Sequence, residues 1–243
     1  MTTLRINLWS GPRNVSTALM YSFAQREDTR VVDEPLYAYY LQRSGADHPG
    51  REEVLAAQSQ DGEEVVREVI LGPCDRPVLF CKQMAHHLPG LRRSFLTQTK
   101  NVLLIRNPSE VLLSYSKVVS FMPEVSDTGI DFQSELLDEL QELGHPPVVV
   151  DSRFLLLDPP GVLSALCQQL GIAFDSAMLS WPAGPRAEDG VWAEHWYGSV
   201  HQSTGFAPYR PPVAQLPDRL RDVAEACRPH YEKLTALALR SPG

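Results

Sequence analysis

The chain is poor in cysteine and has no long hydrophobic run. Its 243 residues include four cysteines, and no two of them form a CxxC pair. This spacing argues against a disulfide framework and a zinc site, and it favours reduced thiols in a cytosolic protein. No apolar run approaches the ~18 residues that a membrane-spanning helix needs. The first residues already read as a strand, so we expect no signal peptide and a cytoplasmic location.

Positive charge is also scarce. The formal net charge is −8, from 22 basic and 30 acidic residues, whereas a protein that binds nucleic-acid phosphates needs a basic surface. We therefore expect neither a nucleic-acid nor a membrane partner, while the oligomeric state is left open. The sequence contains no internal repeat, no low-complexity tract and no clear linker. With 43% hydrophobic residues, it predicts a single domain over residues 1–243.

Short apolar runs alternate with helical patterns along the chain. This alternation is typical of an α/β fold in which a parallel β-sheet is flanked by helices. Five segments have the apolar character of strands: Leu4–Trp9, Arg30–Val32, Pro77–Cys81, Asn101–Ile105 and Pro147–Val150.

The helices between these strands are marked by apolar spacing and by signals at their ends. Asn107 and Glu110 predict a helix start with a capping box. The charged segment 51–68 is typical of a solvated helix, and Pro229 is expected to kink or restart the last helix. From residue 174 to about 212 the pattern is irregular and has no clear period.

The most informative segment is Ile6–Thr17. An apolar run stops at residues 10–12, and a helical pattern begins immediately afterwards. A strand, a tight loop and a helix N-terminus in this order present free backbone N–H groups and the positive end of a helix dipole to one spot, where a phosphate can bind. Arg13 and the hydroxyls of Ser16 and Thr17 add charge and hydrogen-bond donors there. An ordinary strand–helix turn would have the same outline.

This loop lacks the features of a Walker A motif. That motif reads G-x-x-x-x-G-K-[ST], and here no lysine follows the loop and the second glycine is missing. No obvious magnesium-holding aspartate stands at the end of a later strand, since Ile105 is followed by Arg106. The loop therefore fits a nucleotide phosphate, and an ATP-dependent P-loop phosphotransferase is the alternative reading.

A second motif follows the fourth expected strand. The strand at residues 101–105 delivers Arg106 to the carboxyl edge of the sheet, where ligands collect in doubly wound folds. Ser114 lies two turns into the next helix. An arginine and a serine that converge at this edge can bind a second phosphate. Taken alone, Arg106 is more often a helix-capping or surface residue.

Together the two motifs resemble the sulfotransferase family, whose donor is 3′-phosphoadenosine 5′-phosphosulfate (PAPS). The family's loop for the 5′-phosphosulfate reads roughly P-K-S-G-T-T-W-L, and residues 12–19, PRNVSTAL, align with it without a gap. Its motif for the 3′-phosphate, R-N-P-x-[DE]-x-x-x-S, is met by residues 106–114, RNPSEVLLS. Lys82 matches a lysine at the end of a preceding strand, and residues 157–172 resemble a later D-P…L-G-[IV] segment. The resemblance extends from residue 4 to about 181.

The resemblance implies a P-loop NTPase-like sulfotransferase fold and a role for each matched residue. Arg13, with Lys82, would contact the leaving phosphate as a catalytic residue. The 3′-phosphate would be held by Arg106 and Ser114. No metal ion is implied, because cationic side chains and backbone donors can stabilise the charge that builds on the leaving bisphosphate. The donor's 5′-phosphate would be bound by the loop residues Arg13, Asn14, Val15, Ser16 and Thr17.

Several residues depart from the family's pattern. Arg13 replaces the loop lysine and keeps the charge but not the compact ammonium. Val15 replaces a glycine, which restricts the backbone, and Ala18 replaces the tryptophan that stacks on adenine in cytosolic members. The family's C-terminal R-K-G clamp has only Arg210 as a loose substitute. These departures keep open a non-catalytic nucleotide-binding module of the same fold.

The acceptor hydroxyl or amine also needs a general base. Glu34, just after the second expected strand, resembles the acceptor-side acid of carbohydrate and bacterial sulfotransferases. His86 or His87 follows Lys82 as a catalytic histidine follows a lysine in the cytosolic enzymes, although at longer spacing, and a histidine suits neutral pH. Surface or packing roles compete with both. The sequence thus predicts sulfuryl transfer from PAPS to a small-molecule acceptor, in a pocket shaped by residues 174–212, with Glu34 slightly ahead of His86 as the base.

Overall fold

Five β-strands form one sheet in the computed structural model, which describes residues 3–116 and 122–241. Their order in the sheet is β2–β3–β1–β4–β5. β2 pairs in parallel with β3, with Asp33 opposite Lys82, and β4 pairs in parallel with β5. The expected α/β fold with a parallel sheet is confirmed, and each of the five expected strands is present. The strands are β1 (Leu4–Ser10), β2 (Thr29–Asp33), β3 (Val78–Met84), β4 (Lys100–Ile105) and β5 (Val148–Asp151).

The chain divides into two compact units. The first is made of residues 1–8, 16–100 and 175–206, and the second of residues 9–15, 101–174 and 207–243. The boundary passes through β1 and again just before α1 (Ser16–Ala24), so the loop that follows β1 belongs to the second unit. The single domain expected for residues 1–243 stays a prediction.

In the first unit, α1 packs against β2 and β3. Leu19, Met20 and Phe23 of α1 are buried, and the ring of Phe23 stacks on that of Phe80 in β3 with the centroids 4.1 Å apart. Every residue of β3 is buried, as expected for a strand of a parallel sheet that is covered on both faces. The 3-10 turn η4 (Ser176–Leu179) also packs against α1.

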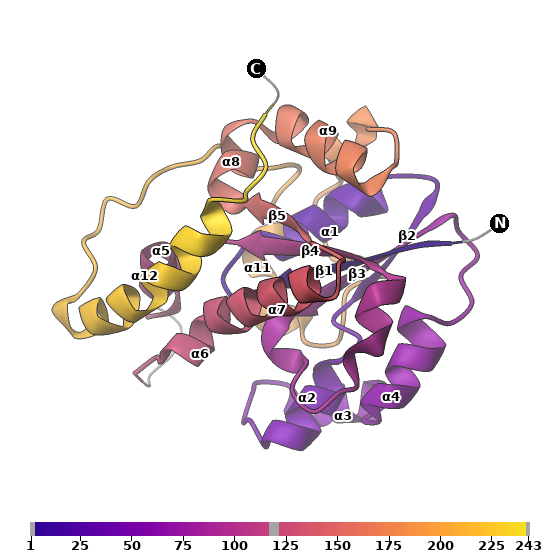
Figure 1. Ribbon diagram of the computed structural model, residues 1–243, viewed down its shortest axis with the longest axis horizontal. Coiled ribbons are helices and arrows are strands. Elements are labelled where there is room, and N and C mark those ends of the chain that lie inside the picture. Colours follow the sequence, from indigo (N-terminus) through magenta and orange to yellow (C-terminus); the bar gives the residue numbers. More distant parts are fainter. Residues whose placement is uncertain (1–2, 117–121, 242–243) are drawn as a thin grey trace. The chain divides into compact units, whose positions relative to one another are not determined.

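Short helices of the first unit surround a shared apolar cluster. α2 (Tyr37–Ser44) packs against α3 (Arg51–Ala57), and Figure 1 shows them side by side. The irregular region contributes α10 (Ala193–Trp196) and α11 (Gly198–His201). The cluster therefore attaches the irregular region to α2 and α3. Its buried members are Tyr37, Ala38, Leu41, Val54, Trp192, Ala193 and Tyr197.

The charged segment 51–68 is not the single solvated helix that its composition suggests. It forms α3, then α4 (Gly62–Val65), which leads directly into the π-helical turn η1 (Val66–Ile70). A new helix begins after Asp61, whose carboxylate accepts hydrogen bonds from the N–H groups of Glu63 and Glu64 and caps α4. Val54 is fully buried, so the segment is also part of the apolar core.

In the second unit, α12 (Arg221–Thr235) lies alongside α7 (Ile130–Glu142) and also contacts α5 (Pro108–Tyr115) (Figure 1). α8 (Ser152–Leu157) and α9 (Pro159–Leu170) pack on β5. No helix in the described part of the chain is long and apolar enough to cross a membrane. The remaining short elements are α6 (Val125–Thr128) and η5 (Asp218–Leu220) in this unit, and η2 (Ala85–His87) and η3 (Arg93–Gln98) in the first.

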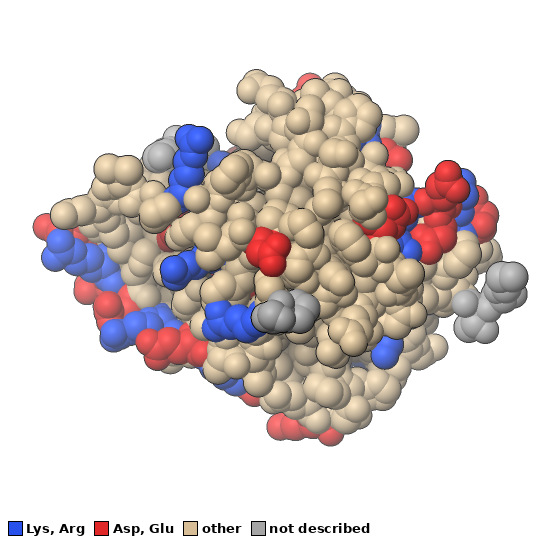
Figure 2. Space-filling view, turned by 90° about the horizontal axis from the view of Figure 1, so that it is seen from above, with Lys and Arg blue, Asp and Glu red and all other residues tan. Residues whose placement is uncertain are grey.

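Pro229 is expected from the sequence to kink or restart the last helix, and α12 shows that the helix does not restart there. It continues through Pro229 as one helix, although proline removes a hydrogen bond from the helix interior. Figure 2 shows charged side chains of both signs next to one another at the left of the view, where this helix lies. Within α12, Arg228 forms an exposed ion pair with Glu225, and exposed pairs of this kind contribute little to stability. α12 is therefore held mainly by its buried residues Cys227 and Leu234.

Candidate active site

The loop between β1 and α1 is held in place by its own side chains. Arg13 has a positive φ of 55°, a conformation that is unfavourable for residues other than glycine. The amide Nδ2 of Asn14 donates to the carbonyl of Leu104 at 2.9 Å, and its Oδ1 accepts from the N–H of Val15 at 2.8 Å. The loop is thus anchored to β4, and the N–H of Val15 is engaged within the loop.

The two phosphate motifs meet at this loop. Nη1 of Arg106 donates to the carbonyl of Arg13 at 2.7 Å, and Nε of Arg13 donates to Oγ of Ser114 at 3.0 Å. The guanidinium of Arg106 therefore contacts the loop, and its side chain is 29% exposed. Arg13, Asn14, Arg106 and Ser114, four residues singled out from the sequence, lie together in the second unit.

The start of α5 orients Arg106. Asn107 caps the helix by accepting a hydrogen bond from the N–H of Ser109 at 2.9 Å, as its position predicts. The expected capping box is wrong, because the carboxylate of Glu110 is used elsewhere. It accepts from Nε of Arg106 at 3.1 Å and from the hydroxyl of Tyr209 at 2.7 Å. Glu110 therefore binds Arg106 of the 3′-phosphate motif and does not cap its own helix.

Positive charge is concentrated at the loop. Burial lowers the pKa of Arg13, and the nearby charge of Arg106 lowers it further. Arg106 is paired with Glu110, whereas Arg13 has no carboxylate partner within the residues that the structure describes. A bound anion would relieve the repulsion between the two guanidinium groups, and charge-assisted hydrogen bonds from a guanidinium to a phosphate are strong.

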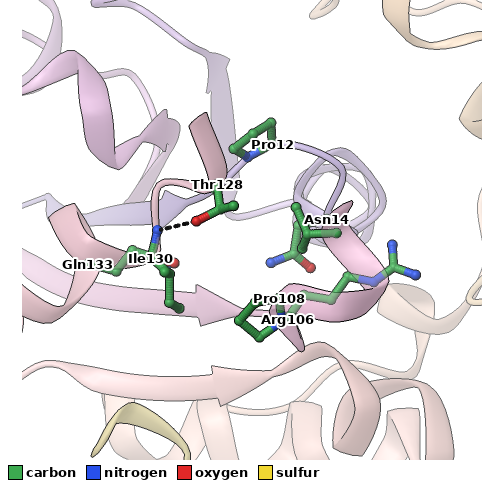
Figure 3. A pocket seen from close by; sticks show the side chains of 9 residues that line it. Pro12, Asn14, Arg106, Pro108, Thr128, Ile130 and Gln133 are labelled. Carbon is green, nitrogen blue, oxygen red and sulfur yellow. Dashed lines mark hydrogen bonds between the residues drawn. The ribbon is translucent and has the colours of Figure 1, made fainter. Parts of the chain in front are cut away.

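A pocket lies beside the loop, where α6 leads into α7. Figure 3 shows Thr128 and Ile130 on one side and Asn14 on the other, with the side chain of Arg106 extending past Asn14. The N–H of Ile130 donates to Oγ1 of Thr128 at 3.4 Å. The pocket wall is tight at Gly11, where a Cβ atom would lie 2.2 Å from the carbonyl oxygen of Thr128. The lining residues are Gly11, Pro12, Asn14, Arg106, Pro108, Val111, Thr128, Ile130 and Gln133.

Ser16 and Thr17 follow the loop directly and begin α1 in the first unit. Ser16 is buried and Thr17 is half-buried. Neither hydroxyl makes a hydrogen bond within residues 3–116 and 122–241. Both therefore keep a donor for a ligand, as their place at a helix N-terminus predicts.

Lys82 lies at the centre of a buried polar group in the first unit. Its side chain is 2% exposed. Nζ donates to Oδ1 of Asp33 at 2.9 Å, to Oε1 of Glu34 at 2.5 Å and to the hydroxyl of Tyr197 at 2.7 Å. These three bonds use all three N–H groups of the ammonium. The structure thus joins Lys82 to Glu34, and the lysine has no further donor for a phosphate in this arrangement.

Burial and charge act in opposite directions on this group. Burial by itself lowers the pKa of Lys82, but the carboxylates of Asp33 and Glu34 raise it well above its ordinary value. Burial raises the pKa of Glu34, the positive charge of Lys82 lowers it, and the negative charge of Asp33 raises it. The net effect is a raised pKa. A carboxylate with a raised pKa is closer to the value that a general base needs near neutral pH.

His86 and His87 lie in the turn η2 after β3. The ring of His87 stacks on Tyr40 with the centroids 4.6 Å apart, and His86 meets the same ring edge-on. Nδ1 of each histidine is buried without a hydrogen-bond partner in the described part of the chain. Burial lowers the pKa of His86 to about 3. Its imidazole is therefore neutral at pH 7 and a weak base.

Two members of the buried group were missed from the sequence. Asp33 stands beside Glu34 at the end of β2, where adjacent side chains of a strand point to opposite faces. The positive φ of Glu34, 37°, breaks this alternation and brings both carboxylates to Lys82. Tyr197 lies 115 residues from Lys82, and no local pattern marks it.

Comparison with known proteins identifies the family. A family model described as "Sulfotransferase domain" matches residues 4–238. Two proteins of Arabidopsis thaliana, Branched-chain-amino-acid aminotransferase-like proteins 2 and 1, are 40% and 43% identical to the chain over 230 residues. The match covers 94% of this chain and 41% of each relative. The chain thus spans about two fifths of the length of these relatives.

Two solved structures with a similar fold are sulfotransferases. The sulfotransferase domain from the Synechococcus PCC 7002 olefin synthase has a TM-score of 0.54 and 19% identity, over 93% of this chain and 95% of that one. A sulfotransferase from Alicyclobacillus acidocaldarius has a TM-score of 0.52 and 12% identity, over 100% of this chain and 98% of that one. At these identities the likeness shows the fold alone, which is the P-loop NTPase-like fold expected from the sequence. Because the family model matches nearly the whole chain, the protein belongs to the sulfotransferase domain family.

Proposed function

We propose that the protein transfers a sulfuryl group from PAPS to a hydroxyl or amine of a small-molecule acceptor. Membership of the family supports sulfuryl transfer in general. The donor assignment depends on one observation: Arg13 and Arg106 meet at one loop beside the hydroxyl of Ser114, with a single carboxylate partner between them in the described part of the chain. Two cations with one counterion suit a ligand that carries two phosphate groups.

Each end of the donor has its own residues in this proposal. Arg106 and Ser114 bind the 3′-phosphate. The two hydroxyls at the start of α1 suit the other end, because they have no partner in the described chain and the N-terminus of a helix favours an anion. The 5′-phosphosulfate is bound by Arg13, Ser16 and Thr17, and also by Asn14 and Val15 once the ligand replaces their present hydrogen bonds to Leu104 and to each other.

Negative charge builds on the leaving bisphosphate as its bond to sulfur breaks. The sulfuryl group carries one negative charge, so cationic side chains and backbone donors suffice to stabilise this charge, and the proposal includes no metal ion. Arg13 makes this contact because its charge has no carboxylate partner in the described chain. Lys82 can assist only if its ammonium leaves one of its present partners, Asp33, Glu34 or Tyr197.

Glu34 is the proposed general base. Its Oε1 accepts from Lys82, whereas Oε2 makes no hydrogen bond within the described residues. As the acceptor oxygen or nitrogen bonds to sulfur, Glu34 takes the acceptor's proton. The bond from sulfur to the 5′-phosphate oxygen breaks, and its electron pair leaves with the bisphosphate. His86 is the alternative, but a pKa of about 3 makes it the weaker base.

The proposal also covers the surroundings of the reaction. The irregular region 174–212 receives the small-molecule acceptor, in a cytoplasmic protein with neither a nucleic-acid nor a membrane partner. The aminotransferase-like names of the Arabidopsis thaliana relatives describe chains more than twice as long as the matched segment. Those names therefore do not assign amino-group transfer to this chain.

Thermal stabilisation by ligands tests the donor assignment. We expect adenosine 3′,5′-bisphosphate to raise Tm at lower concentrations than ADP, equally with and without magnesium, because the second phosphate has its own arginine. At a concentration of 100 times Kd the stabilisation is about 2.7 kcal/mol. Arg106→Ala removes the preference for the bisphosphate. Arg228→Ala, on the exposed side of α12, is the matched control and keeps it.

The alternatives give different results in the same experiments. Equal shifts with ADP, or shifts that require magnesium, contradict the donor assignment and favour an ATP-dependent phosphotransferase. Transfer of labelled sulfate from PAPS to a panel of hydroxyl and amine acceptors is then measured. Selective binding of the bisphosphate without any transfer identifies a non-catalytic nucleotide-binding module of the same fold.

A further inference from the structure

The buried group around Lys82 holds more negative than positive charge. One ammonium lies between two carboxylates, Asp33 and Glu34, whose side chains are 1% and 10% exposed. Burying a carboxylate is costly unless it is paired and hydrogen-bonded. The way in which the two carboxylates share Lys82 therefore decides which of them remains able to take a proton.

The two carboxylates are satisfied unequally. Oδ1 of Asp33 accepts from Lys82 at 2.9 Å, and Oδ2 accepts from the hydroxyl of Tyr197 at 2.7 Å and from the N–H of Gly190 at 3.4 Å. Both oxygens of Asp33 are thus engaged. Glu34 accepts only through Oε1 in the part of the chain that the structure describes. Oε2 of Glu34 is the carboxylate oxygen that remains for a further proton.

Tyr197 connects Lys82 and Asp33 to the apolar cluster. Its hydroxyl donates to Asp33 and accepts from Nζ of Lys82, and Nε1 of Trp192 also reaches it at 3.2 Å. The whole residue is 5% exposed. Because its ring is packed in the cluster, the hydroxyl cannot move without leaving Asp33 and Lys82 short of a hydrogen bond.

The backbone of Glu34 is fixed as well. Its N–H donates to the carbonyl of Lys82 at 2.8 Å, and its carbonyl accepts from Nε2 of Gln58 at 3.1 Å. A strained φ persists where the surrounding structure determines it in this way. From α2, the hydroxyl of Tyr37 is hydrogen-bonded to His48 at 2.8 Å, and burial, followed by the charge of Glu34, raises the pKa of Tyr37. The side chain of Glu34 is therefore presented from a rigid position.

We propose that Asp33 and Tyr197 are positioning residues for Glu34. Asp33 and Tyr197 bind two of the three N–H groups of Lys82, so that the ammonium pairs with one oxygen of Glu34 only and the other oxygen is left for the acceptor's proton. Glu34 is thus the base and Asp33 is not. This inference rests on the proposed sulfuryl transfer. Asp33 keeps Glu34 basic in two ways, because its charge opposes a second negative charge nearby and because it takes a share of the Lys82 ammonium.

A carbon-13 NMR titration of the carboxyl groups in the full chain measures this effect without substrate. Glu34→Gln identifies the Glu34 signal by its disappearance. We expect Asp33→Asn to lower the titration midpoint of Glu34 by about one pH unit, because the repulsion is removed and Lys82 pairs with Glu34 alone. We expect Tyr197→Phe, which keeps the ring, to raise the midpoint, because Asp33 then draws Lys82 toward itself.

Tyr231→Phe is the matched control. It removes a tyrosine hydroxyl that donates to a carboxylate, that of Asp151 at 2.6 Å, in the second unit. The Glu34 midpoint is expected to stay at its wild-type value in this variant. A shift as large as that of Tyr197→Phe would overturn the inference.

The outcomes separate the positioning role from the proposed function. An unchanged Glu34 midpoint in Asp33→Asn and Tyr197→Phe overturns the inference, and if Asp33→Asn does not fold, Tyr197→Phe decides alone. The acid limb of the kcat/KM profile should move in the same direction as the midpoint in each variant, which a loss of stability would not produce. If the midpoints shift but the wild type transfers no sulfuryl group from PAPS, the proposed function fails while the positioning of Glu34 stands.

Discussion

Acidification tests how far the half-buried imidazole of His86 is shielded from water. Burial, with a smaller contribution from His48, lowers the pKa of His86 to about 3, whereas a histidine in an unfolded chain titrates near ~6.5. Below pH ~6.5 the unfolded chain therefore binds a proton that the folded chain does not bind. The free energy of unfolding consequently falls as the pH falls from this value toward the pKa of the folded state.

The size of the loss follows from the distance between the two pKa values. One pH unit within this window corresponds to about 1.4 kcal/mol, so a fall from pH 7 to pH 5 removes roughly 2 kcal/mol through His86 alone. Burial also lowers the pKa of His87 well below its ordinary value, which adds to the loss in the same direction. Since domains are typically stable by only about 5–15 kcal/mol, the effect is easy to measure.

Urea denaturation at pH 7 and at pH 5 provides the measurement. His86→Gln keeps a polar side chain that cannot be protonated, so the loss between the two pH values should shrink by roughly 2 kcal/mol. His145→Gln, at an exposed histidine, is the control and should retain the wild-type loss. Comparing the loss, and not the absolute stability, separates the proton from the packing that the substitution changes. An undiminished loss in His86→Gln would refute the burial of His86 and restore it as a candidate base.

Two predictions concern the second unit and are checked by urea and thermal unfolding. Gly11→Ala should destabilise the protein by about 1–3 kcal/mol, because the new Cβ lies 2.2 Å from the carbonyl oxygen of Thr128. Gly198→Ala, where a Cβ has open space around it, is the control. Equal stability of the two variants would contradict this close approach. Pro229→Ala should raise Tm and increase the free energy of unfolding by up to about 3 kcal/mol, because alanine restores an N–H donor inside α12. A lower Tm would mean that the proline stabilises the protein by restricting the unfolded chain.

Local patterns in the sequence determined the strands and the two phosphate motifs. β3, β4 and β5 each contain a short apolar run, and a strand covered on both faces of a parallel sheet requires such a run whatever its neighbours are. The start of α5 is also a local matter, since Asn107 caps a backbone N–H of its own helix. The continuation of α12 through Pro229 is not local, because the buried Cys227 and Leu234 hold the helix on either side of the missing hydrogen bond.

The partners of the charged side chains were decided by the tertiary structure. Glu110 has the position of a capping-box residue, yet Arg106 and Tyr209 take its carboxylate. The bond between Arg13 and Ser114 joins residues 101 positions apart. The motif in the sequence placed both near an anion, but their direct contact forms only when the loop after β1 packs beside α5.

The buried group of the first unit shows the same division. Glu34 and Lys82 could be named from the sequence because one directly follows a strand and the other matches the strand lysine of the family's pattern, whereas Asp33 joins them only through the positive φ of its neighbour. Tyr197 comes from an irregular region whose pattern predicts no contact at all. A buried charge must find partners wherever the chain can supply them, because its desolvation costs several kcal/mol. Which residues supply those partners is decided only when distant segments pack together.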